Sequence, residues 1–133
     1  MTVNERIIYS ISVSKSNVFL RRDFKLMGSK SQVNRTILNL IRDGLIVRIG
    51  LGVYARAKRS VLSGKPIPAQ PVSVLAPEVL QRLGIEVYPS KLTRDYNEDK
   101  TTQIPIGNVV NVGSRRIKRK LGFGAQEIKY END

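Results

Sequence analysis

The residues of this chain best suited to chemistry are polar and cationic side chains repeated at helical spacing between residues 30 and 42. They are Lys30, Ser31, Gln32, Arg35, Asn39 and Arg42. At about 100° per residue, most of them fall on one face of a helix. Arginine, asparagine and glutamine side chains are the types that form hydrogen bonds with base edges, and lysine and serine contact phosphates. The pattern therefore predicts a surface that binds duplex DNA.

The helix that would carry these side chains is predicted from its two ends and from its apolar stripe. Ser29 stands three residues before Gln32, which is the spacing of a capping box, and Gly44 supplies the left-handed residue that commonly ends a helix. The apolar stripe consists of Val33, Ile37, Leu40 and Ile41. We therefore expect a recognition helix from Lys30 to about Asp43.

The segments on either side of this helix complete a recognisable motif. Residues 21–26 can form a short helix that turns tightly into the longer one. Residues 45–49 and 53–55 are short β-rich runs joined by Gly-Leu-Gly, which predicts a hairpin directly after the helix. The combination is typical of a winged helix-turn-helix. Arg48 and Arg56 would flank the wing and contact phosphates beside the groove.

Other groups of residues that are suggestive of catalytic or metal sites are incomplete. Residues 12–15 read Ser-Val-Ser-Lys, but the companion Ser-Asp-Asn and Lys-Thr-Gly elements of the penicillin-recognising enzymes are absent. Asp95, Glu98 and Asp99 form a local carboxylate cluster that lacks the glycine and distal glutamate of a calcium loop. The chain has no histidine and no cysteine, which removes the commonest general base and the thiolate metal ligands. We therefore expect neither enzymatic activity nor a bound metal or cofactor.

The positive charge of the chain is large and unevenly distributed. The 133 residues carry a net charge of +12; residues 1–60 hold twelve Lys and Arg against three Asp and Glu, and residues 61–133 hold eleven against eight. A field of this sign raises the encounter rate with polyanions such as DNA. No apolar run is long enough to span a bilayer or to serve as a signal peptide, and a chain without cysteine suits a reducing compartment. We expect a cytoplasmic protein that does not bind membranes.

The expected fold class is α+β, with an N-terminal winged helix-turn-helix followed by a small α/β module. The DNA-binding domain would span residues 1–58 and the second module residues 71–133, beginning with a helix at residues 74–83. Between them, residues 59–70 contain two prolines, a Ser-Gly pair and two cations, which predicts a basic linker. The cationic run from Arg115 to Lys120 has three interpretations: a second nucleic-acid surface, a site for an acidic protein, or an edge strand protected by charge.

A set of residues spread over the chain carries a family resemblance. In the first half they are Val18-Phe19, Asp23-Phe24, Gly28-Ser29, Val33, Leu38, Leu40, Gly44-Leu45-Ile46, Arg48 and Gly52-Val53-Tyr54. In the second half they are residues 101–105, Val109-Val110 and Ser114-Arg115-Arg116-Ile117. Through them, nearly the whole chain resembles the AbiEi-type antitoxins, the regulators of type IV toxin–antitoxin systems. The resemblance implies an antitoxin that represses its own operon through the winged helix and counters a nucleotidyltransferase-type toxin with its other half. Because this chain is shorter than the larger members, we expect an extended neutralising region to be reduced or missing.

The sequence thus predicts a sequence-specific DNA-binding transcriptional regulator, the autorepressing antitoxin of a two-gene operon. Its expected partners are operator DNA and a nucleotidyltransferase-type toxin. The alternative is an interaction module whose basic second half binds an acidic protein while the winged domain serves as a scaffold. Duplex binding that depends on Arg35 distinguishes the two.

Overall fold

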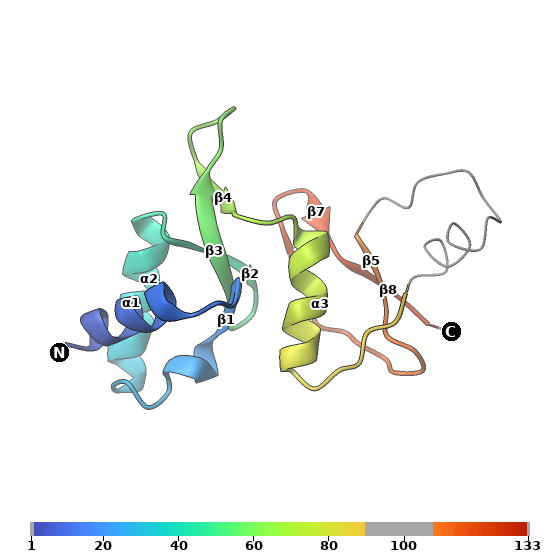
Figure 1. Ribbon diagram of the computed structural model, residues 1–133, viewed down its shortest axis with the longest axis horizontal. Helices are drawn as coiled ribbons and strands as arrows, with labels where there is room; N and C mark the ends of the chain where they lie inside the picture. The colour runs from blue at the N-terminus through green and yellow to red at the C-terminus, as the bar shows by residue number, and fades with distance from the viewer. Residues whose placement is uncertain (1, 90–107, 133) are drawn as a thin grey trace. The chain divides into compact units, whose positions relative to one another are not determined.

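The computed structural model describes residues 2–89 and 108–132, which form a mixed α+β arrangement (Figure 1). The chain divides into two compact units, Met1–Gln70 and Pro71–Asp133. The α+β class expected from the sequence is therefore found. The carboxylate cluster Asp95, Glu98 and Asp99 and residues 101–105 of the family resemblance lie outside the described residues.

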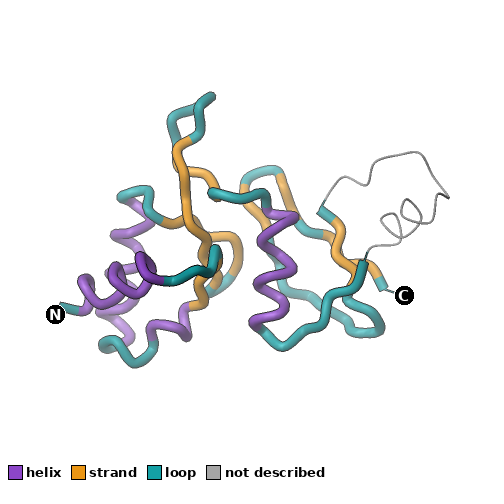
Figure 2. The backbone as a smooth tube through the Cα atoms, viewed as in Figure 1, coloured by secondary structure: helices purple, strands orange, loops and turns teal. Residues whose placement is uncertain are grey.

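The first unit contains three helical segments and a four-stranded antiparallel sheet. Its elements are α1 (Val3–Val13), β1 (Val18–Leu20), the 3-10 helix η1 (Arg21–Phe24), α2 (Lys30–Arg42), β2 (Ile46–Gly50), β3 (Val53–Arg59) and β4 (Pro66–Pro68). The strands have the order β1-β3-β2, and β4 pairs with the far half of β3. Helices α1 and α2 pack on each other and lie to one side of the strands (Figure 2).

One apolar core holds α2 against the rest of this unit. The core residues are Ile7, Phe19, Phe24, Val33, Ile37, Leu40, Ile46 and Tyr54. The rings of Phe19 and Phe24 lie with their centroids 6.4 Å apart and tilted by 31°, so the segment from β1 to η1 is anchored by aromatic packing. Three core residues belong to α2, and the opposite side of that helix is left for solvent.

Both predicted ends of α2 are confirmed by their hydrogen bonds. The Ser29 Oγ accepts from the Gln32 N–H at 3.2 Å, and the Gln32 Oε1 accepts from the Ser29 N–H at 3.0 Å, which completes the capping box. At the other end Gly44 has φ +77°, and the N–H groups of Gly44 and Leu45 donate to the carbonyls of Ile41 and Leu40. This is a Schellman ending, and it turns the chain directly into β2.

The segment expected to be a linker is in part a strand. Pro66–Pro68 pair with residues 57–59 of β3, so residues 59–70 belong to the first unit and do not form a free connection. Two prolines in three residues make a strand hard to predict from the sequence, because proline donates no backbone hydrogen bond. An edge strand tolerates proline. Here Ser60 and Ala69 supply the flanking N–H groups, which donate to Lys65 and Arg56.

The β3–β4 hairpin projects beyond the rest of its unit (Figure 1). Its tip is an ordered turn, since the Ser60 Oγ accepts from the N–H groups of Leu62 and Ser63, and the Gly64 N–H donates to the Ser60 carbonyl. The side chains of Val61 and Leu62 at the tip are fully exposed.

The second unit packs one helix against short strands. Its elements are α3 (Val72–Arg82), β5 (Val109–Asn111), β6 (Gly122–Phe123), β7 (Gln126–Glu127) and β8 (Lys129–Glu131). Strands β5 and β8 are parallel, β6 and β7 are antiparallel, and α3 lies against β5. Asn111 is fully buried and accepts from the Gly113 N–H at 2.8 Å while donating to the Pro89 carbonyl at 3.2 Å.

Two sequence expectations for this unit were wrong in detail. Helix α3 begins two residues earlier than expected, so Pro77 lies inside the helix, beyond its first turn, where it removes one backbone hydrogen bond. Residues 115–120 form no strand, so the interpretation of the run from Arg115 to Lys120 as an edge strand is wrong. Their five cations are all exposed and leave no alternating face that a sheet could bury.

Candidate nucleic-acid interface

The outward face of α2 is a stripe of four exposed side chains. They are Ser31, Arg35, Leu38 and Arg42, which recur at intervals of four, three and four residues along the helix. Residues at these spacings lie above one another on a single helix face. The stripe thus combines two guanidinium groups and a hydroxyl with one apolar side chain, Leu38, which is 65% exposed.

This face is rotated relative to the one predicted from the apolar pattern. The prediction placed Ile41 in the buried stripe and Asn39 on the outward face. In the structure Thr36 is buried at 5% exposure while Ile41 is only half-buried, and Asn39 is half-buried as well. The outward face therefore centres on Leu38, with Asn39 at its margin.

Several predicted site residues on α2 already have partners within the protein. The Gln32 side-chain oxygen is engaged in the capping box, so this residue stabilises the start of the helix. The Arg42 Nε lies 3.5 Å from the Asp43 Oδ1, but both side chains are more than half exposed, and such a surface ion pair is weak. Lys30 and Arg35 are exposed to solvent.

The hairpin of β2 and β3 presents one of its two predicted arginines to solvent. Arg48 is exposed on β2, and its Nε donates to the Gly50 carbonyl at 3.3 Å. The register shifts between Arg48 and Gly50, which marks a bulge and increases the local twist of the hairpin.

Arg56, which the sequence predicted to contact phosphates, uses its guanidinium for contacts within the protein. Its Nη2 donates to the carbonyls of Ile11 at 2.7 Å and Ser14 at 2.5 Å, and its Nε donates to the Ser16 carbonyl at 3.0 Å. The guanidinium carbon lies 5.0 Å from the centroid of the Phe19 ring. Because the last carbonyls of a helix lack partners within it, a guanidinium at the end of α1 can satisfy that of Ile11 and complements the negative end of the helix dipole.

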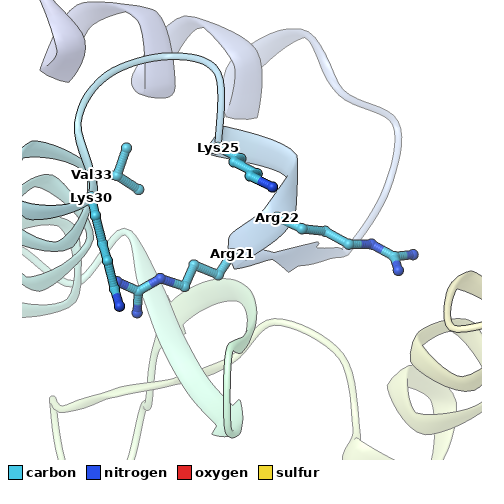
Figure 3. A pocket seen from close by; sticks show the side chains of 5 residues that line it. All are labelled: Arg21, Arg22, Lys25, Lys30 and Val33. Atoms are coloured by element: carbon cyan, nitrogen blue, oxygen red, sulfur yellow. The ribbon is translucent and has the colours of Figure 1, made fainter.

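A pocket of about 440 Å³ lies beside the start of α2. It is lined by Arg21, Arg22, Lys25, Lys30 and Val33 (Figure 3). None of the described residues that line it is acidic, and the first turn of α2 contains no acidic residue. The positive end of the helix dipole therefore adds to the four cations, and the region attracts anions.

Three of the cations that line the pocket were not among the predicted site residues. Arg21, Arg22 and Lys25 were assigned only to the first helix of the helix-turn-helix. The signal that identifies them is local charge, since three of five consecutive residues are cationic immediately before the turn into α2. Leu38 was missed because an apolar residue on a polar face carries no signature of its own.

Residues 2–89 and 108–132 show no features of a metal site or of a membrane-spanning helix. No group of three metal-ligating side chains is brought together there. None of the helices described has the length and apolarity needed to cross a membrane. No protein-family model matches the chain, and no curated protein matches it.

Proposed function

We propose that this protein is a sequence-specific DNA-binding transcriptional regulator whose first unit is a winged helix-turn-helix. The observation that carries the proposal is the exposed stripe Ser31, Arg35, Leu38 and Arg42 on α2, and a cationic pocket lies beside the start of the same helix. An α-helix fits the major groove of B-DNA, where arginine pairs with guanine and an apolar side chain contacts the thymine methyl group.

The topology of the first unit supports this assignment. Helix η1 and α2 are joined by a tight turn, and the β2–β3 hairpin follows α2 directly. In a helix-turn-helix the second helix enters the groove while the first lies over the backbone. With α2 in the groove, Arg22 and Lys25 of the preceding segment are suited to phosphates, and Arg48 would act from the wing.

The family resemblance extends the proposal to an operon. We infer an antitoxin of the type IV class that represses its own transcription through the first unit and opposes a nucleotidyltransferase-type toxin through the second. The second unit offers an exposed cationic segment, residues 115–120, for contacts of its own. The same segment favours a second candidate function, the binding of an acidic protein with the first unit as a scaffold.

A selection experiment tests DNA binding without knowledge of the operator. The full-length chain is used to enrich duplexes from a randomised library, and the affinity for the winning sequence is compared with that for a scrambled duplex by fluorescence anisotropy. Arg35→Ala is expected to lower the affinity for the selected duplex by about 1–3 kcal/mol and to relax its specificity. Arg6→Ala, which removes an exposed cation from α1, is the matched control and should bind like the wild type.

Two outcomes would contradict the proposal. The first is a library that shows no enrichment. The second is an Arg35→Ala variant that binds the selected duplex as well as the Arg6→Ala variant does. Either result would show that α2 does not bind in the major groove. The antitoxin part is tested separately, by expressing the chain with the product of the adjacent gene from promoters that it does not control. Failure to restore growth would leave a regulator without antitoxin activity.

A further inference from the structure

The pocket beside α2 contains two cations that face each other without a counter-charge. The side chains of Arg21 and Lys30 point toward one another (Figure 3), and the described residues lining the pocket include no carboxylate. Like charges that line one pocket repel each other. An anion placed between them would turn this repulsion into two favourable contacts.

Arg21 is anchored through its backbone, and its side chain ends in a buried donor. Its backbone N–H donates to the Gly52 carbonyl at 3.0 Å, which ties the start of η1 to the β2–β3 turn. Its side-chain Nη2 is buried and has no hydrogen-bond partner; among the described residues, the Asn34 Oδ1 is the other buried side-chain atom in this condition. A buried donor on a charged group is unfavourable when it lacks an acceptor, so an acceptor is expected to occupy this place.

We propose that Arg21 and Lys30 together bind one phosphate group, and that this group is a phosphodiester of the duplex contacted by α2. The inference rests on the proposed function. A guanidinium fork matches two phosphate oxygens, and an ammonium group adds a point charge. The pocket of about 440 Å³ has room for the phosphate and the adjoining sugar, whose apolar face would lie against Val33.

This contact would fix the register of α2 in the groove. Phosphate contacts carry no sequence information directly, but they position the element that reads the bases. Because Arg21 is bonded to the β2–β3 turn and Lys30 is the first residue of α2, one bound phosphate would align both parts on the backbone. Loss of the contact should therefore weaken binding to all duplexes.

The salt dependence of binding by the full-length protein tests the pocket. Affinities of Arg21→Gln, Lys30→Gln and the double variant for the selected duplex are measured by anisotropy at several salt concentrations. Affinity falls as salt rises, and each single variant should make the slope of log affinity against log salt less steep by about 0.9. Between 50 and 200 mM salt, this corresponds to about a threefold smaller loss of affinity than in the wild type. The double variant should make the slope less steep by the same amount, because both side chains bind the same phosphate.

A matched control and a chemical probe make the test specific. Arg6→Gln removes the same charge from α1 outside the pocket and should leave the slope unchanged. Duplexes with a single neutral methylphosphonate are scanned along the backbone. A methylphosphonate at one position should weaken binding by the wild-type protein and have no effect on binding by the Arg21→Gln variant. Denaturation curves of each variant establish that it is folded.

The outcomes separate this inference from the proposed function. If the wild type binds duplex but Arg21→Gln and Lys30→Gln behave like Arg6→Gln, the phosphate site is refuted and the proposed function stands. If the wild type binds no duplex, adenosine monophosphate and inorganic phosphate are titrated while the Arg21 side-chain N–H resonance is followed. A shift would then assign the pocket to a free phosphate compound and refute the duplex as its ligand. No shift would refute the site altogether.

Discussion

Replacement of Arg56 by alanine should destabilise the first unit. It should leave the salt dependence of DNA binding by that unit unchanged. The guanidinium donates to three backbone carbonyls, those of Ile11, Ser14 and Ser16, and it lies over the ring of Phe19. These contacts join strand β3 to the end of α1 across more than forty residues of sequence. Arg56 is therefore expected to act in folding and not at the nucleic-acid surface.

The size of the effect follows from these contacts. Hydrogen bonds to a charged group contribute about 1.5–3 kcal/mol each when buried, and a cation–π contact about 0.5–1 kcal/mol at a partly exposed site. Arg56 is only half-buried, so water recovers part of what the alanine variant loses. A net loss of about 2–4 kcal/mol in the free energy of unfolding is expected. For a unit of this size, that loss lowers Tm by about 10–25 °C.

Thermal and guanidinium unfolding followed by circular dichroism measures this loss. Arg48→Ala is the control, because it removes the same charge from the neighbouring strand at an exposed position and should change stability by less than about 0.5 kcal/mol. Arg56→Lys keeps the charge but not the planar fork, and it should recover only part of the lost stability. Wild-type stability in Arg56→Ala, together with a smaller salt slope for duplex binding, would refute the structural role and restore Arg56 to the phosphate contacts.

Three further predictions address the wing, the unit boundary and the second unit. Arg48→Ala should lower the slope of log affinity against log salt by about one, and an unchanged slope would remove Arg48 from the interface. A fragment of residues 1–70 should unfold cooperatively and at a higher temperature than one of residues 1–58, because the shorter fragment lacks β4; equal melting temperatures would make β4 dispensable. Burial raises the pKa of Tyr130 above its ordinary value of 10, against the opposing charge of Arg119. Since the folded chain then holds this proton more tightly than the unfolded chain, stability should fall as the pH rises above about 10. Tyr130→Phe should lose this part of the decline, and matching alkaline profiles for the two proteins would contradict it.

The parts of the fold that sequence predicts well are those encoded within a few residues. Ser29 and Gln32 lie one helical turn apart, and Gly44 follows the apolar stripe, so both ends of α2 are local signals. The β2–β3 hairpin likewise follows from two apolar runs with a glycine-rich turn between them. These signals are sufficient to place a polar helix face next to a hairpin.

The parts that sequence does not predict depend on contacts between distant segments. Nothing near Arg56 reveals that carbonyls at the end of α1 lie beside it. The rotation of α2 was missed because the choice between Thr36 and Ile41 for the core is made by the packing partners of the helix and not by its own sequence. The pocket was missed for the same reason, since Arg21 and Lys30 meet only after η1 and α2 have folded together.

The tip of the β3–β4 hairpin has a consequence for how this chain can change over evolution. The turn is held by the hydroxyl of Ser60 and by backbone bonds, while the Val61 and Leu62 side chains contact nothing that the fold requires. Substitution of either residue by a polar one should therefore cost little stability, and solubility alone would favour such a change. Neutral drift should replace them readily in descendants of this sequence. If aliphatic residues persist at both positions, the fold does not explain their retention, and selection for contact with another molecule does. Sequence variation at these two positions therefore indicates whether the hairpin makes such a contact in the cell.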